Sequence, residues 1–585
     1  MKMRLREKDP NSIDWVNAKS QSLQSREDLL NLDPAFARSL SRELGVHHLN
    51  DRLCPALLTN GRAGLFCIQS ARFEDQSLAT LDLLVSKGFH MSDPAIFLLP
   101  LSLLLSLNEE GATIGGSAKR MHVSLPSKDQ PGQRSSVNAA FDEILQWACH
   151  HHASDIHINV LRQSPWSGIR FTLGGKYVLP ERFNRMPSNV LLDMLSVLWM
   201  DVVGGNGAVF DPNIEQQGRL NRIVEGRQVQ LRWASLATDR GPSVCLRLLM
   251  LDQAESTPHL SELGYLPSQV QAMERCQAAP GGAIVLAGTV GAGKSTTIAT
   301  LMKRIPSQRK VITIEDPVEY LIPNALQNTV ARDLGHDDLV AFDAKLKTVK
   351  RCAMNDLLIG EIRDQVGGRA FIDMAGTGVS LYTTVHASSA LLIPERLSSE
   401  LIGVPRDLLS TPGVFKLLVY QRLMPTLCQH CAMNIDQILV DAEWTCAQQQ
   451  IRARQWKESW IEKLERTFQA DIRRIRFRNA EGCDACRHPG LRDLNGFDGR
   501  TVLAELIEPG LEPDFLTCLT DRDPMALNRW FESRPRSALS EPDMEGKSAF
   551  ECALYKVLVG QIDPRDVEIQ FKEVCRWPGS RQHVH

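Results

Sequence analysis

A glycine-rich turn constrains the fold of this chain more than any other feature of its sequence. Residues 288–295 read Gly-Thr-Val-Gly-Ala-Gly-Lys-Ser and match the pattern G-x-x-x-x-G-K-[ST]. The apolar run before them, residues 283–287, predicts a buried strand, and residues 295–305 after them have the periodicity of a helix. A strand, a tight turn and a helix in this order are typical of an open, largely parallel sheet wrapped by helices. We therefore predict an α/β core.

The same turn predicts a site for a nucleoside triphosphate. Its glycines allow backbone N–H groups to converge on phosphate oxygens, and the N-terminus of the following helix adds a favourable dipole. In this motif Lys294 reaches the β- and γ-phosphates, and the Ser295 hydroxyl holds Mg²⁺. A chance Gly-rich turn is the alternative, which the agreement of both flanks disfavours. The predicted binding residues are Gly288, Thr289, Val290, Gly291, Ala292, Gly293, Lys294, Ser295 and Thr296.

Three later segments, residues 310–316, 356–364 and 379–387, predict further strands of the same sheet. Their carboxyl ends meet at one edge, where sheets of this kind carry ligand chemistry. From the residues alone, an acid there can be a solvated charge at a strand end, and a histidine can be a hydrogen-bonded core residue. The acidic and histidine side chains at that edge are Glu315, Asp316, Glu319, Glu361 and His386.

Four blocks, in order, resemble the secretion ATPases of type II secretion, type IV pilus and related type IV secretion machines. They are the turn that contains Lys294, the Asp box at residues 313–320, an atypical Walker B segment at residues 357–364 and the His box at residues 383–390. The resemblance covers about residues 135–585. It implies a RecA-like P-loop core that hydrolyses ATP.

The resemblance also implies roles for three side chains. Glu315 is expected to orient or deprotonate the attacking water, Glu361 to support Mg²⁺ and that water, and His386 to sense the γ-phosphate. Two positions depart from the family pattern, because Val379 stands where the family often has His, and Met354 begins a Met-Asn-Asp sequence in place of Asp-Pro-Asp. These departures leave a nucleotide-dependent scaffold with little turnover open as an alternative.

The part of the chain before the core predicts a small α+β domain. Residues 137–151 have apolar residues at helical spacing, and residues 154–160 and 168–178 alternate like strands. This part resembles the PAS-like domain that precedes the motor core in the same family. The resemblance places Arg232 and Arg247 where arginine fingers reach the nucleotide phosphates, a contact worth about 10³ to 10⁵ in rate. From the residues alone, both could be solvated side chains on strands.

The chain has 14 cysteines, and two Cys-x-x-Cys pairs stand out among them. Each such turn points two thiolates at one place, and two turns complete a closed tetrahedral site, for which zinc is the default ion. Unpaired thiols are the alternative. The segment also resembles the pilus-assembly and secretion subgroup of the family. The predicted ligands are Cys428, Cys431, Cys483 and Cys486.

The long insertion between the cysteine pairs predicts an amphipathic helix. Its aromatic and aliphatic residues recur at a spacing of four, which places them on one face of a helix. Such a helix can pack against the core by itself. The residues are Trp456, Trp460, Leu464 and Phe468.

Length and charge limit the remaining possibilities. With 585 residues the chain is too long for one core, and about three to five domains are expected. A formal net charge of −3 gives no footprint for a polyanion, so direct nucleic-acid binding is not expected. No signal peptide and no run of about 18 uncharged apolar residues is found. The nearest run, residues 95–107 with Pro100, is expected to be a buried helix or a pair of strands, with an interfacial site as the alternative.

Composition and motifs together suggest domain boundaries. The expected parts are an N-terminal accessory domain (1–107), a linker (108–134), the α+β domain with the arginines (135–255), the RecA-like ATPase domain (256–425), the tetracysteine zinc module (426–500) and a C-terminal helical region (501–585).

The resemblance finally implies a cellular role. It predicts a cytoplasmic homohexamer, associated with the inner membrane through partners, that couples ATP hydrolysis to type IV pilus assembly or type II protein secretion. The expected partner is an inner-membrane platform protein. Retraction motors of the same superfamily generally lack the long N-terminal part and the four cysteines, so assembly or secretion is favoured. A conjugation-type ATPase for DNA transfer, with the same site, remains an alternative.

Overall fold

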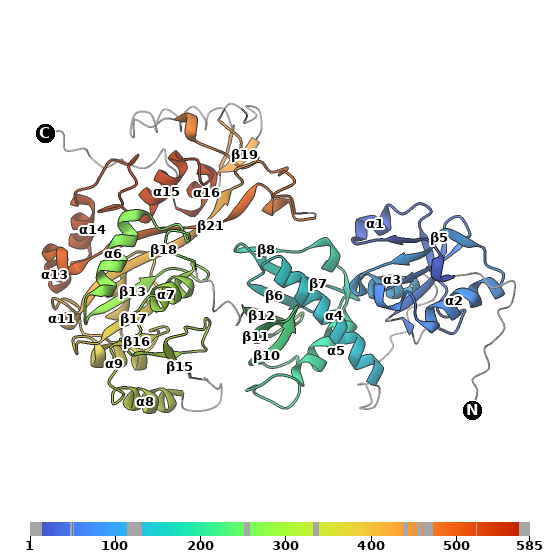
Figure 1. The fold of residues 1–585 in the computed structure, drawn as a ribbon, viewed down its shortest axis with the longest axis horizontal. Helices are drawn as coiled ribbons and strands as arrows, with labels where there is room; N and C mark the ends of the chain where they lie inside the picture. The colour runs from blue at the N-terminus through green and yellow to red at the C-terminus, as the bar shows by residue number, and fades with distance from the viewer. Residues whose placement is uncertain are drawn as a thin grey trace. The chain divides into compact units, whose positions relative to one another are not determined.

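The computed structural model describes residues 15–46, 49–50, 52–113, 131–250, 258–330, 338–435, 437, 443–446, 449–452, 460, 472–488, 490–521 and 523–571. The chain divides into two compact units, Met1–Leu249 and Met250–His585, and each is described by itself. Figure 1 labels the helices and strands.

The first unit begins with a five-stranded sheet of strand order β1-β5-β4-β3-β2. Strand β5 lies parallel to β1 and β4, whereas β3 is antiparallel to β4 and to β2. Leu53 and Leu65 face one apolar cluster, and their neighbours Cys54 and Phe66 face another, so both faces of this sheet are covered. The elements are β1 (Ser20–Ser22), α1 (Arg26–Leu30), β2 (Phe36–Ser39), β3 (Leu53–Leu58), β4 (Ala63–Cys67), α2 (Asp75–Ser86), β5 (Met91–Leu98) and α3 (Leu101–Thr113).

Residues 95–107 form the end of β5 and the first part of α3, and so are neither one helix nor two strands. Pro100 explains the change, because proline cannot donate to a strand ladder and its fixed φ suits the start of a helix. Its carbonyl oxygen accepts the first helical bonds, from the backbone nitrogens of Leu103 and Leu104 at 3.1 Å each. Within the described ranges, no helix has both the length and the apolar character needed to cross a bilayer.

A second, seven-stranded sheet follows in the first unit, with the order β10-β11-β12-β6-β7-β8 and β9 beside β7. Buried and half-buried residues alternate along β7, so one face of the sheet packs and the other is more open. Helices α4 and α5 contact each other and this sheet, which confirms the predicted α+β domain. The elements are α4 (Pro131–His150), β6 (Asp155–Asn159), β7 (Trp166–Leu173), β8 (Lys176–Val178), β9 (Met186–Pro187), α5 (Ser188–Trp199), β10 (Gln216–Val224), β11 (Arg227–Thr238) and β12 (Gly241–Met250).

Helix α3 connects the two halves of the first unit. The Ser102 hydroxyl donates to Oε1 of Glu143 on α4 at 2.7 Å, and Arg182 Nε donates to the same oxygen at 3.1 Å. The expected linker, residues 108–134, overlaps the end of α3 and the start of α4. Residues 114–130 of that linker lie outside the described residues.

The second unit is built on a seven-stranded sheet of order β15-β14-β16-β17-β13-β18-β21. Every neighbouring pair is parallel except β18 with β21. In β13, Ala283, Val285 and Ala287 face the cluster formed with α9 and α10, while Ile284 and Leu286 face the cluster formed with α6 and α7. Burial of both faces explains the uninterrupted apolar run, and the predicted α/β core is confirmed.

The predicted strand segments of this core coincide with β13, β14, β16 and β17. The first segment, residues 283–287, matches β13, whereas the other three extend past the observed strands, because the residues at their ends belong to the following turns. The elements are α6 (Pro267–Ala278), β13 (Ala283–Ala287), α7 (Lys294–Lys303), β14 (Val311–Glu315), β15 (Ala325–Thr329), α8 (Asp338–Val349), β16 (Asp356–Ile359), α9 (Gln365–Met374), β17 (Ser380–Val385), α10 (Leu392–Leu397), α11 (Arg406–Leu409), β18 (Phe415–Leu427) and β21 (Phe497–Ile507).

Helices α13 to α16 make up most of the described residues from 513 to 571, whereas the predicted helical region began at residue 501, which lies inside strand β21. Helix α15 is buried along most of its length and shares an apolar cluster with Ile475, Phe477 and Trp460. Of the predicted amphipathic helix only Trp460 is described, and the rest lies outside the described residues. The elements are β19 (Glu443–Cys446), β20 (Gln449–Arg452), α13 (Pro513–Thr520), α14 (Pro524–Ser533), α15 (Ala549–Leu558) and α16 (Pro564–Gln570).

Candidate nucleotide site and cysteine cluster

The glycine-rich turn lies between β13 and α7 and packs against strand β18. A Cβ atom on Gly288 would lie 2.4 Å from the carbonyl oxygen of Gln421, so a side chain cannot be accommodated there. Gly293 is the N-cap of α7 and has φ of 81°, in the left-handed region that favours glycine. The turn therefore closes tightly on the N-terminus of α7, the end of a helix that binds anions.

Buried polar contacts hold this turn from behind. Gln421 Nε2 donates to the carbonyl oxygen of Ala292 at 2.8 Å, and the Tyr265 hydroxyl donates to Gln421 Oε1 at 2.6 Å. The same hydroxyl lies 3.2 Å from Oγ1 of Thr297 on α7. Sequence reasoning missed Tyr265 and Gln421. The available signal was a glutamine that interrupts the apolar strand of residues 417–420.

Lys294 lies among acidic groups at the mouth of the turn. Its Nζ donates to the carbonyl oxygens of Gly288 at 2.8 Å and Thr289 at 3.1 Å. Burial lowers the pKa of Lys294, and the negative charges of Glu361 and Glu319 oppose that shift. The lysine predicted to reach phosphate is thus held on its own loop, close to the Walker B acid.

His386 joins the turn to the Walker B segment. Its Nε2 lies 2.8 Å from Glu361 Oε1, and its Nδ1 lies 3.2 Å from the carbonyl oxygen of Gly288. Both ring nitrogens therefore face oxygen acceptors. Glu361, His386 and the Lys294 turn are thus brought together.

Glu315 ends β14 beside the Walker B strand. Its Oε1 accepts from Thr313 Oγ1 at 2.6 Å and from Gln327 Nε2 at 3.1 Å. Burial raises the pKa of Glu315, and these two hydrogen bonds partly offset the shift. A Cβ atom on Gly360 would lie 3.5 Å from the Glu315 Cα, so the backbone immediately before Glu361 runs next to Glu315.

Two further predicted residues of this site, Ser295 and Thr296, lie on the first turn of α7. Ser295 is exposed there, and Thr296 Oγ1 lies 2.9 Å from the Tyr320 hydroxyl. Asp316, one residue after Glu315, pairs with Arg363 at 3.0 Å. The Asp box and the Walker B segment are therefore also tied together by an ion pair at their exposed ends.

The two predicted arginines belong to the first unit, so their position relative to the turn stays a prediction. Arg247 Nε donates to Oδ1 of the buried Asp155 at 2.9 Å. Arg232 is half-buried on β11, where it is opposite Arg219 of β10. Both arginines point to the more open face of the second sheet, because their strand neighbours are buried.

The four predicted cysteines meet in space. Their sulfur atoms all lie within 4.8 Å of one another. A tetrahedral ion bound at about 2.3 Å requires sulfurs about 3.8 Å apart. Three of the contacts match that requirement, with 3.8 Å between Cys428 and Cys483, 3.5 Å between Cys431 and Cys486, and 3.8 Å between Cys483 and Cys486. The cluster is therefore compatible with a metal ion such as zinc.

The surroundings of one cysteine in this cluster, Cys486, favour its thiolate form. Burial works against the thiolate of Cys486, but the backbone N–H groups of Cys483 and Gly496 both donate to its sulfur at 3.3 Å. Together with the thiols of Cys431 and Cys428, these N–H groups outweigh burial and lower the pKa of Cys486 to about 7. Because the thiolate is the metal ligand, this backbone arrangement favours metal binding.

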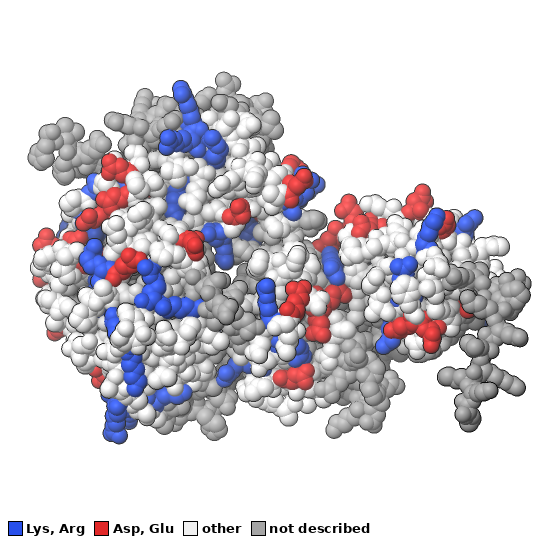
Figure 2. Space-filling model, in the orientation of Figure 1, with Lys and Arg blue, Asp and Glu red and all other residues white. Residues whose placement is uncertain are grey.

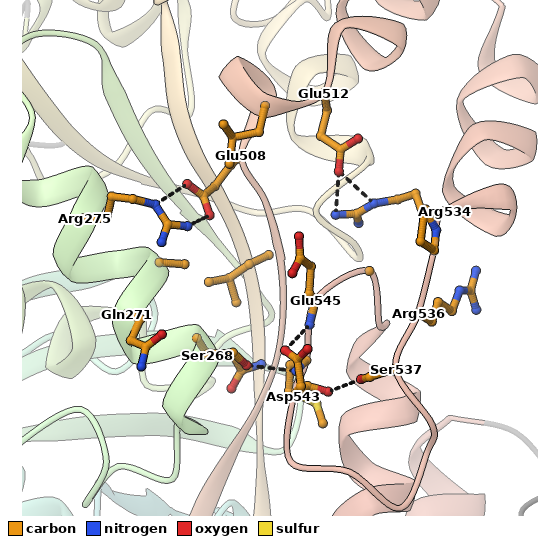
Figure 3. A pocket seen from close by; sticks show the side chains of 17 residues that line it. Ser268, Gln271, Arg275, Glu508, Glu512, Arg534, Arg536, Ser537, Asp543 and Glu545 are labelled. Carbon is orange, nitrogen blue, oxygen red and sulfur yellow. Dashed lines mark hydrogen bonds and ion pairs between the residues drawn. The ribbon is translucent and has the colours of Figure 1, made fainter.

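A cavity of about 560 Å³ lies elsewhere in the second unit, between α6, the end of β21 and residues 534–546. Figure 3 shows Arg275 paired with Glu508 on one side and Arg534 paired with Glu512 on the other. Its lining includes none of the residues predicted to bind nucleotide or metal.

The space-filling view shows both charge signs interspersed over the visible face (Figure 2), in keeping with the formal net charge of −3.

Residues 130–525 match the family model described as Type II/IV secretion system protein. The chain belongs to this family. Type II secretion system protein E of Klebsiella pneumoniae is 31% identical over 310 residues, which are 52% of this chain and 58% of that protein. The type IV pilus assembly ATPase PilB of Thermus thermophilus is 28% identical over 302 residues, 52% of this chain and 32% of that protein. Type II secretion system ATPase E of Vibrio cholerae is 28% identical over 387 residues, 66% of each chain. The chain thus spans between about a third and two thirds of these relatives.

The environment of Glu315 predicts a pH-dependent gain of stability on its replacement. A carboxyl whose folded-state pKa is raised contributes stability that is fully present below its unfolded value, near 4.5, and is lost as the pH rises through the folded value. Glu315→Gln keeps the acceptor for Thr313 and Gln327 and cannot ionise. We expect its thermal midpoint to exceed that of the wild type at pH 7 to 8, with the difference closing towards pH 5.

Thermal unfolding across that pH range measures the effect. Glu400→Gln, at an exposed position of the same unit, is the control and should leave the midpoint unchanged. A Glu315→Gln variant that is less stable by the same amount at every pH would show that the carboxyl is not under desolvation strain.

Proposed function

We propose that this chain is an ATPase whose turnover drives type II protein secretion or type IV pilus assembly. One observation carries the proposal: Lys294 and His386 both bind the carbonyl oxygen of Gly288, and His386 also pairs with Glu361. Residues that follow three parallel strands, β13, β16 and β17, thus meet at one turn. The names of the relatives, type II secretion system protein E and type IV pilus assembly ATPase PilB, support both the hydrolysis and the two machines.

The chemistry follows from the positions of the side chains. Lys294 would exchange the carbonyl oxygens of its own turn for the β- and γ-phosphate oxygens of ATP, and the Ser295 hydroxyl would hold Mg²⁺. Bound Mg²⁺ supplies positive charge across those oxygens. Burial brings the pKa of Glu315 upward, towards the range in which a carboxylate serves as a general base for water. Because His386 contacts both the turn and Glu361, a movement of the turn also moves Glu361.

Arg232 and Arg247 complete the site in this proposal. Phosphoryl transfer needs positive charge over the equatorial oxygens of the transferred group. The two arginines lie on the more open face of their sheet. Closure of that domain on ATP is the step that produces force.

The chain works as a homohexamer in the cytoplasm and acts on an inner-membrane platform protein. Mass measurement of the purified chain with ATP tests the hexamer, and a monomer at micromolar concentration would count against it.

The cysteine cluster holds a structural zinc ion in this proposal. Four cysteine ligands leave no open coordination position, which is typical of structural sites. Metal analysis after native purification should find about one zinc per chain. The double change Cys483→Ser and Cys486→Ser should remove it and lower the thermal midpoint, whereas Cys518→Ser, outside the cluster, should leave the zinc content unchanged. Zinc-free wild-type protein would contradict the assignment.

Replacement of Lys294 tests the ATPase directly. Lys294→Ala should reduce the rate of Mg²⁺-dependent phosphate release by about 10²-fold or more. It removes the positive charge that stabilises the transferred phosphoryl group. Circular dichroism should show an unchanged fold. Undiminished hydrolysis in this variant would refute the site. A wild type that binds ATP without turnover, even with its membrane partner, would instead be the nucleotide-dependent scaffold.

The arginines allow a separate test. Arg232→Ala or Arg247→Ala should lower kcat by about 10³ or more if the side chain reaches the transition state. Arg170→Ala, on the same sheet, is the control and should retain most of the activity. Full activity in both Arg232→Ala and Arg247→Ala would leave the two side chains as ordinary strand arginines.

A further inference from the structure

A buried carboxylate, Glu505 of β21, connects two segments that are far apart in the chain. Its Oε1 accepts from the backbone nitrogen of Ala390 at 2.7 Å, and its Oε2 accepts from the backbone nitrogen of Ala549 at 3.0 Å. The residue is 6% exposed. Each carboxylate oxygen thus fixes the backbone of a different segment.

The first of these segments carries His386. Residues 386–389 are exposed or half-buried, and Ala390 is the first fully buried residue after His386. The backbone nitrogen that Glu505 holds thus belongs to the fourth residue after the histidine. Strand β17 fixes this segment at one end, directly before His386, and the bond to Ala390 fixes it at the other. Both ends together place His386 against Gly288 and Glu361.

The second segment is the N-terminus of α15. Ala549 is the first residue of that helix, after the N-cap Ser548, and a carboxylate is favoured at a helix N-terminus. Further along α15, Lys556 Nζ donates to the carbonyl oxygens of Gly264 at 2.6 Å and Val502 at 2.8 Å. The helix is thus held firmly on the core, so it is a rigid support for the other oxygen of Glu505.

The neighbourhood of Glu505 in the sheet strengthens the argument. In the β18–β21 pair, Glu505 is opposite Tyr420, and the next position pairs Ala504 with Gln421. Gln421 is the residue that holds the phosphate-binding turn from behind. Two neighbouring rungs of one strand pair therefore support the turn and the His386 segment.

Burial makes this carboxylate costly. It raises the pKa of Glu505, and the backbone N–H groups of Ala549 and Ala390 oppose the shift. An apolar residue of similar size would avoid the desolvation cost but would leave both backbone N–H groups without an acceptor. The acid at this place therefore serves its two backbone contacts, one of which holds the His386 segment.

We propose that Glu505 is a positioning residue, which fixes the segment of residues 386–390 to helix α15 and so sets His386 for ATP hydrolysis. The inference rests on the proposed ATPase function. It gives the C-terminal helices a direct mechanical connection to the nucleotide site.

Glu551 offers a matched control at the same helix end. It is also buried, and its Oε2 accepts from the backbone nitrogen of Ser548 at 2.8 Å. Its Oε1 pairs with Arg536, which borders the cavity of Figure 3, at 2.9 Å. Glu551 therefore caps α15 without touching the His386 segment. Its loss reports what capping alone contributes.

The test compares Glu505→Gln, His386→Ala, their double variant and Glu551→Gln in the full chain. Glutamine keeps one acceptor oxygen and turns an N–H₂ group towards the other backbone N–H. We expect Glu505→Gln to lower kcat by about 10²-fold with little change in KM, because the misplaced group acts in the chemical step. The double variant should be no slower than His386→Ala, because Glu505 acts through His386. Glu551→Gln should lose stability and keep its kcat.

Amide hydrogen exchange of residues 386–393 tests the position independently of turnover. The exchange should be faster in Glu505→Gln and unchanged in Glu551→Gln. The inference would be overturned by any of three results. They are unchanged exchange in Glu505→Gln, a double variant whose fold-loss of kcat is the product of the two single losses, and a loss of kcat in Glu551→Gln equal to that in Glu505→Gln. A wild type without turnover refutes the proposed function instead, and the exchange result then decides whether Glu505 holds the segment.

Discussion

The carbonyl oxygen of Gly288 accepts from two side chains that reach it from different parts of the chain, Lys294 Nζ at 2.8 Å and His386 Nδ1 at 3.2 Å. That oxygen is in place only because the turn packs closely on β18, where the Gln421 backbone leaves no room for a Cβ atom at position 288. The proposed nucleotide site therefore depends on the approach of a glycine to a neighbouring strand. The side chain of Gln421 secures the same approach through its bond to Ala292.

Charge in this site is balanced by opposite effects of burial. Desolvation lowers the pKa of Lys294 and raises that of Glu315, so both groups are moved towards their neutral forms. A bound phosphate group would favour the charged form of Lys294, and a bound metal ion would favour the charged form of Glu315. In each case a nearby opposite charge stabilises the ionised group. The site is thus less stable without a ligand than with one. This is common where binding drives a conformational step.

The parts of the fold that were predicted from sequence have local signals. The turn at residues 288–295 has a fixed local geometry, and the strands β13, β14, β16 and β17 are apolar runs with polar ends. The supports of the site have no such signal. Tyr265 meets Gln421 across 156 residues, and Glu505 meets Ala390 across 115. A buried polar side chain is satisfied by whichever partner the tertiary fold brings to it, and sequence spacing does not reveal that partner.

The cysteine cluster joins the ends of the strand pair that supports the site. Cys428 follows β18 directly, and its backbone nitrogen donates to the Gly496 carbonyl oxygen, just before β21, at 3.0 Å. Whether the cluster also shapes the nucleotide site depends on the strands between them. The register of β18 with β21 shifts between Pro425 and Leu427, and regular pairing resumes from there to Gln421 and beyond. The irregular stretch separates the cluster from the rung that holds the turn. An ion in the cluster would therefore stabilise the cysteine segment first, while the continuous ladder around Gln421 and Glu505 keeps the site in shape.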